Sequence, residues 1–337
     1  MSFRFRKSIK IAKGVRLNVS KSGLGTSFGT KGARYSVHSS GRRTTSVGIP
    51  GSGMGYVSTK SSSSSRKPSP RPSTAQQQSY SPPSAKAPGL FSPAGEKAMW
   101  NALTKQGGSL EALDAVAASH LDKRGLALTF SSMKRSSMDG ERETALKGLE
   151  ELVSGGFDPQ HDSFFAKYLT SSAGTVKIAD GVTAELPVSR ELLALTLAEL
   201  LQEKQQLKEA CDVLEALPIS QFTMLSLSEL YLQRKEYDKV VSLTNGVNNE
   251  DDTSALTCVY RGVALRNKEL NDAALIAFKE ALRFSSRSEE IRHLALVQRA
   301  MVHIKLGKKA QAKKDLERVI AEDASFPGAT HLLEKLQ

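Results

Sequence analysis

The stretch ALTCVYRGVALRNKELNDAALIAFKEALRFSSR, residues 255–287, decides the fold. In it, Gly262 is followed twelve residues later by Ala274, and then by Phe278 and Ala281. Small residues at these offsets allow the two helices of a hairpin to pack closely, because a bulky side chain would hold them apart. The stretch therefore predicts a helix–turn–helix unit.

The same offsets recur before and after this unit. The recurring sets are Ala198, Ala210, Leu214 and Leu217; Ser228, Val240, Thr244 and Val247; and Ala300, Ala312, Leu316 and Val319. The key position of each second helix falls at residue 210, 240, 274 or 312, so the spacings are 30, 34 and 38. Four divergent copies of one helical hairpin are predicted from about residue 189 onward.

On these positions, residues 189–337 resemble the tetratricopeptide repeat (TPR) family, whose units run about 34 residues. Cys258 departs from the pattern because the family often has tryptophan there, and Arg261 stands where it has leucine. The resemblance implies a stack of helical hairpins that binds a partner. The amphipathic segment 328–337 is predicted to be a capping helix.

The first helices of such a stack line a groove, which is predicted to bind an extended or helical peptide. TPR proteins that grip a carboxy-terminal carboxylate use Lys and Asn on a first helix, and Leu195 and Glu199 stand in those places here. That clamp is therefore not expected, and the capping helix could instead cover part of the surface. The predicted groove residues are Val259, Val263, Arg266, Val297, Met301, Ile304 and Lys305.

Residues 93–188 have helical spacing over 98–104, 110–120 and 144–153, with an apolar patch at 164–169. Near 174–187, two alternating segments flank Asp180-Gly181, which is a strong hairpin signal because both turn positions need positive φ. An inserted β-hairpin is predicted there. Whether 93–188 continues the repeat array is left open by the sequence.

Residues 1–58 alternate apolar and polar side chains and contain many glycines, which predicts a small all-β module of about six strands. The blocks FRFRKSIK (3–10), GVRLNVSKSG (14–23), KGARY (31–35) and GIPGSG (48–53) resemble a bacterial domain of unknown function, DUF4236. The resemblance implies a bacterial source and no activity. Residues 59–92 are rich in Ser, Pro and Gln, so a disordered linker is expected.

Charge is distributed unevenly along the chain. Residues 1–95 contain 16 of the 47 Lys and Arg and none of the 35 Asp and Glu, which leaves 31 basic and 35 acidic residues for the remainder. The basic end suggests an anionic partner, either nucleic acid or an anionic membrane or envelope surface. Docking on a protein surface, including its own acidic half, is the other interpretation. The candidate contacts are Arg4, Arg6, Lys10, Arg16, Arg34, Arg42 and Arg43.

No catalytic, cofactor-binding or metal-binding motif is found. The glycine-rich segments miss the phosphate-loop and dinucleotide spacings, the six histidines are scattered, and HExxH, CxxC and GxSxG do not occur. Cys211 and Cys258 are expected to be buried free thiols in a reducing compartment. No apolar run reaches the length of a transmembrane helix.

The sequence thus predicts a multidomain chain: a small all-β amino-terminal module, a disordered linker, and an all-α TPR-like repeat region with one inserted β-hairpin. The predicted function is that of a cytoplasmic, non-enzymatic adaptor that needs no cofactor. The alternative is a nucleic-acid-associated protein that binds through its basic module.

Overall fold

The computed structural model describes residues 7–12, 15–20, 23–30, 33–38, 43–48, 55–60, 87–138, 140–170, 172–179 and 182–336. The chain divides into two compact units. One contains the residues up to Thr175 together with Leu186–Leu193, and the other contains Val176–Glu185 and Ala194–Gln337.

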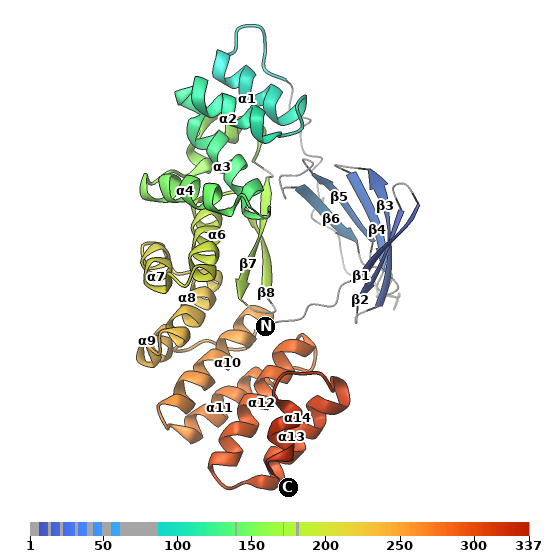
Figure 1. Ribbon diagram of the computed structural model, residues 1–337, viewed down its shortest axis with the longest axis vertical. Helices are drawn as coiled ribbons and strands as arrows, with labels where there is room; N and C mark the ends of the chain where they lie inside the picture. Colours follow the sequence, from blue (N-terminus) through green and yellow to red (C-terminus); the bar gives the residue numbers. More distant parts are fainter. Residues whose placement is uncertain are drawn as a thin grey trace, which may run out of the picture. The chain divides into compact units, whose positions relative to one another are not determined.

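Six strands near the amino terminus pair in sequence order as an antiparallel meander (Figure 1). Representative pairs are Ile9 with Leu17, and Phe28 with Tyr35. The all-β module over 1–58 stays a prediction because the connections between these strands lie outside the described residues, as does 61–86 of the predicted linker. The strands are β1 (Lys7–Ala12), β2 (Val15–Ser20), β3 (Gly23–Thr30), β4 (Ala33–His38), β5 (Arg43–Gly48) and β6 (Gly55–Lys60).

The helical part of the first unit consists of successive packed helices. Contacts join α1 to α2, α2 to α3, and α3 to α4. The chain leaves α1 and α4 through glycines in the left-handed region, since Gly107, Gly108 and Gly156 all have positive φ. The elements are α1 (Ala94–Thr104), α2 (Leu110–Ser119), η1 (Leu121–Lys123), α3 (Arg124–Ser136), α4 (Arg142–Ser154), η2 (Pro159–His161) and α5 (Ser163–Tyr168).

Helix α3 lies within the region predicted to be helical, but it was not singled out as a separate segment because part of its packed face is polar. Thr129, Ser131 and Ser132 are buried on it. A Cβ added to Gly148 of α4 would lie 2.2 Å from the Ser132 hydroxyl oxygen, so the two helices approach closely at that point. Small polar side chains are part of the core here, and they weaken the apolar periodicity from which a helix is predicted.

The predicted hairpin is confirmed as the two-stranded sheet of β7 (Ala173–Ala179) and β8 (Val182–Pro187). Val176 and Ile178 on β7 are buried and alternate with exposed residues, as do Val182, Ala184 and Leu186 on β8. This alternation is the period-two pattern of the sequence. The Asp180-Gly181 turn itself lies outside the described residues.

Pairs of helices make up the rest of the second unit (Figure 1). Helix α10 contacts α8 on one side and α12 on the other, and it also packs against α9 and α11. The first helices of successive pairs therefore stand next to one another. The helices are α6 (Arg190–Glu203), α7 (Leu207–Glu215), α8 (Gln221–Gln233), α9 (Tyr237–Leu243), α10 (Asp252–Asn267), α11 (Asn271–Ala281), α12 (Glu289–Lys305), α13 (Lys309–Glu322) and α14 (Ala329–Glu334).

Four turns of one shape join α6 to α7, α8 to α9, α10 to α11, and α12 to α13. In each turn a residue with positive φ precedes one with φ of −80 to −85° and ψ of 60 to 63°. The N–H of that second residue donates to the carbonyl oxygen five residues earlier at 2.8–3.0 Å, as in a helix that ends on a left-handed residue. The left-handed residues are Gln205, Lys235, Glu269 and Gly307, so the turns recur at the predicted spacings of 30, 34 and 38.

Close packing within each hairpin follows the predicted small residues. An added Cβ on Gly262 would lie 2.4 Å from Cε1 of Phe278, so α10 and α11 meet where the sequence places glycine opposite an aromatic ring. Phe278, Ala274 and Ala281 have no exposed surface. Most matching residues of the other hairpins are also buried, whereas Leu217 and Val247 are half-buried. The buried ones are Ala198, Ala210, Leu214, Ser228, Val240, Thr244, Ala300, Ala312, Leu316 and Val319.

The last hairpin ends on α14, which begins after Gly328 at φ 79°. Ala329 belongs to the core cluster of the last hairpin, which includes Leu296 of α12 and Leu316 and Val319 of α13. Other apolar residues of the terminal segment, Leu332, Leu333 and Leu336, are half-buried against the same cluster. The predicted helix at 328–337 is therefore present and covers the core of the final repeat.

Candidate functional site

The candidate site is a face formed by α10 and α12, which we call the α10–α12 face and define by Val263, Arg266, Met301 and Lys305. Val263 and Arg266 are half-buried on α10, whereas Met301 (36% exposed) and Lys305 are exposed on α12. Val263 and Arg266 are one turn apart, as are Met301 and Lys305, so each pair lies on one side of its helix. A contact between Arg266 and Met301 joins the two helices.

Two of the predicted groove residues are buried, and a third, Ile304, is half-buried like Val263 and Arg266. Val259 is fully buried and Val297 is 5% exposed within the core cluster of the last hairpin. Ile304 packs against that same cluster. Helices α10 and α12 each pack against several other helices. Val259, one turn before Val263, and Val297, one turn before Met301, therefore face neighbouring helices and not solvent. Val259 and Val297 thus belong to the packed side of their helices, and peptide binding by the remaining groove residues stays a prediction.

Arg266 has the most unusual environment on the α10–α12 face. Its Nη1 donates to Oε1 of Gln298, and it also lies 3.1 Å from the sulfur of Met301. Arg266 forms no ion pair within the described part of the chain, and neither Nε nor Nη2 has a hydrogen-bond partner there. Burial lowers the pKa of Arg266 from its ordinary value, while the nearby Tyr237 opposes this shift.

Other cations near Arg266 do have carboxylate partners. Lys305 Nζ lies 2.9 Å from Glu269 Oε1, and Lys268 pairs with Asp238. The Lys305 contact also lowers the pKa of Glu269. Of these three cations, Arg266 alone has no carboxylate partner among the described residues.

Gln298 is the residue of this face that sequence reasoning missed. It lies one turn before Met301 on α12, and its side-chain oxygen accepts from Arg266. A neutral amide holds the guanidinium in place without neutralising its charge. The spacing of three residues from Met301 was the signal that could have identified it.

The basic residues predicted to contact an anionic surface lie outside this description. Arg4, Arg6 and Arg42 are not among the described residues, and for Lys10, Arg16, Arg34 and Arg43 only the strand position is described. The structure therefore places none of their side chains. Binding of nucleic acid, membrane or protein by residues 1–58 stays a prediction.

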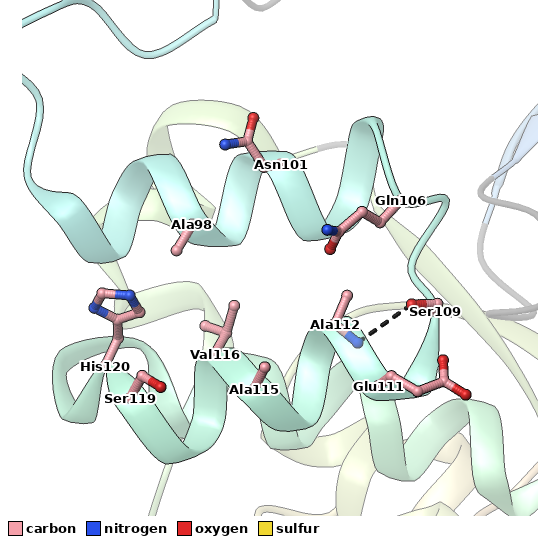
Figure 2. A pocket seen from close by; sticks show the side chains of 10 residues that line it. All are labelled: Ala98, Asn101, Gln106, Ser109, Glu111, Ala112, Ala115, Val116, Ser119 and His120. Carbon is pink, nitrogen blue, oxygen red and sulfur yellow. Dashed lines mark hydrogen bonds between the residues drawn. The ribbon is translucent and has the colours of Figure 1, made fainter.

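A hollow of about 610 Å³ lies between α1 and α2 (Figure 2). Its walls include Ala98, Ala112 and Ala115, whose small side chains leave the space open. Glu111 and His120 also line it, but they stand at opposite ends of α2, roughly 13 Å apart at the helical rise. They are too far apart to act together on one small substrate.

Both cysteines are buried free thiols, as predicted. Burial raises the pKa of Cys211 and of Cys258 to about 11, so neither is a ready nucleophile. Among the described residues no three His, Cys, Asp or Glu are placed to hold a metal ion. No helix in the described ranges is both long and apolar enough to cross a bilayer.

Comparison with known proteins supports the amino-terminal resemblance. Residues 3–57 match the family model described as a protein of unknown function, DUF4236. The predicted resemblance over 1–58 is thereby confirmed, and it covers less than a fifth of the chain. No curated protein matches the chain.

Two solved structures show a distant likeness. The N-terminal domain of the EccA1 ATPase from the ESX-1 secretion system of Mycobacterium tuberculosis is 15% identical, with 72% of this chain and 87% of that chain covered and a TM-score of 0.49. The APC/C hetero-tetramer Cut9–Hcn1 is 14% identical, with 71% and 41% covered and a TM-score of 0.42. With both scores below 0.5, the TPR-like assignment depends on the repeated turns and the hairpin packing described above.

Proposed function

We propose that this chain is a cytoplasmic, non-enzymatic adaptor. Its TPR-like repeats bind a protein or peptide partner, and its basic amino-terminal module holds that partner at an anionic or protein surface. The α10–α12 face is the observation that carries the proposal. It presents Met301 and Val263 beside a cation without a carboxylate partner in the described chain.

Two properties of this face favour a peptide over a small molecule. It spans two neighbouring first helices, so an extended or helical segment could cross both. Methionine is also common at surfaces that adapt to different partners, because its side chain is unbranched and polarizable. An apolar contact next to a charged anchor is the arrangement that gives a peptide both affinity and register.

A site-specific photo-crosslinker tests this proposal. A benzophenone amino acid placed at Met301 of the full-length chain should give discrete crosslinked products in the cells that make the protein, detected by mass shift and identified by mass spectrometry. The matched control places it at Ile276, which is 70% exposed on α11. Equal products from both positions, or none from Met301, would contradict partner binding at the α10–α12 face.

The uneven charge favours a second candidate, nucleic-acid binding by the basic module. If that module contacts phosphates, replacing Arg4, Arg6, Lys10 and Arg16 with glutamine in the full chain should weaken duplex binding roughly tenfold or more at about 50 mM salt. Fluorescence anisotropy at two salt concentrations measures this. A wild-type chain that fails to bind at the lower salt would eliminate this candidate, and the adaptor proposal would be unaffected.

A further inference from the structure

The inference begins with the unused edge of Arg266. Its two hydrogen-bonding contacts, to Gln298 and to Met301, both use Nη1. Nε and Nη2 have no protein partner in the described ranges. These two nitrogens form the side of the guanidinium plane that donates two parallel hydrogen bonds to a carboxylate. The contacts to α12 fix the group and leave this edge available.

The charge at the site limits which class of ligand can bind this edge of Arg266. Lys305 and Lys268 are matched by Glu269 and Asp238, whereas the charge of Arg266 has no carboxylate partner among the described residues. A single carboxylate would balance it. A phosphate group or a nucleic-acid backbone brings more negative charge than one guanidinium neutralises. A carboxylate would also offset the desolvation that lowers the pKa of Arg266.

Apolar groups flank the cation on two sides. Val263 lies one turn earlier on α10, and Met301 comes from α12. A peptide that placed an acidic residue on Arg266 would thus meet apolar surface both before and after it. This favours an acidic side chain inside a peptide over a terminal carboxylate, beyond which the chain does not continue.

We propose that the Nε–Nη2 edge of Arg266 binds the side-chain carboxylate of an Asp or Glu within a partner peptide, and that Val263 and Met301 contact the apolar side chains next to it. The inference rests on the adaptor function proposed above and specifies its partner chemistry. Gln298 is then a positioning residue: it holds the guanidinium while its own neutrality preserves the charge for the ligand.

The experiment uses a random library of twelve-residue peptides displayed with both ends joined to the carrier, panned on the full-length chain. Enriched peptides should share an Asp or Glu flanked by apolar residues. One such peptide, synthesised with acetylated and amidated ends, should bind the wild-type chain. Arg266→Gln should weaken its binding roughly 10- to 100-fold, because a charged bidentate contact is lost.

Two further variants make the result specific. Arg283→Gln removes the same charge from an exposed position at the end of α11 and should leave binding unchanged. Met301→Glu retains Arg266 but places a carboxylate beside its guanidinium, which neutralises the charge that the ligand needs, so it should weaken binding as Arg266→Gln does. Circular dichroism melting of each variant checks that the repeats remain folded.

The outcomes separate the inference from the function on which it rests. Enriched peptides without an acidic residue, equal binding by wild type and Arg266→Gln, or a requirement for a free carboxy terminus would each overturn the carboxylate inference alone. If no peptide is enriched and the crosslinker at Met301 gives no product, both the inference and the adaptor proposal fail.

Discussion

Replacing Phe278 with alanine is expected to lower the free energy of unfolding by about 3–5 kcal/mol, the usual cost of removing a buried aromatic side chain. Phe278 has no exposed surface, and its ring fills the space opposite Gly262 in the α10–α11 hairpin. Urea denaturation followed by circular dichroism measures the change. Phe284→Ala is the control, since this residue is 39% exposed and its loss should cost less than about 1 kcal/mol.

A double variant tests the fit between the two helices more sharply. Gly262→Ala alone should cost about 1–3 kcal/mol through overpacking, because its Cβ would overlap the Phe278 ring. Combining it with Phe278→Leu should relieve that overlap, since the first and last hairpins already pair alanine with leucine at these positions. The two changes should therefore cost clearly less than their sum. Strict additivity would show that the pair does not meet as described.

The second large effect is expected at Asp315 on α13. Its carboxylate accepts from Nε and Nη2 of Arg299 at 2.8 and 2.6 Å, and its side chain is 9% exposed. Asp315→Ala leaves the largely buried guanidinium without a partner and should lower the free energy of unfolding by about 3 kcal/mol. Thermal melting of the full chain measures this as a fall in Tm.

The matched controls distinguish the buried pair from charge alone. Asp212→Ala breaks the pair of Lys208 and Asp212, in which both side chains are more than half exposed, and should change stability by less than about 0.5 kcal/mol. The double variant Arg299→Met with Asp315→Leu replaces both charges by apolar groups and should recover most of the loss. A double variant as unstable as Asp315→Ala would mean that the charge pair itself is required.

The repeats could be predicted because close packing restricts residue type strongly. Gly262 opposite Phe278 is a steric requirement that no other residue satisfies with that ring in place. The Asp-Gly signal that located the hairpin has a similar origin, because such a turn needs residues that tolerate positive φ. Where the structure allows few residue types at a position, the role of that position can be predicted from a single sequence.

Other features depend on neighbours that a linear pattern does not identify. Helix α3 lies in the predicted helical region but was not singled out, because Ser131 and Ser132 are buried with polar side chains. Val259 and Val297 were placed in the groove because the neighbours of their helices were unknown. The isolation of Arg266 is also invisible in sequence, since it requires knowing which acids have already paired with Lys268 and Lys305.

The four matching turns have a consequence for how this array tolerates change in length. Helix α12 begins 18 residues before its left-handed turn residue, Gly307. Helix α8 begins only 14 residues before its own, Lys235. The difference of four residues extends α12 by about 6 Å at the edge away from the turns. One border of the array is therefore level and the opposite border is stepped. Differences in length between repeats are therefore accommodated at the ends of the helices that lie away from the turns.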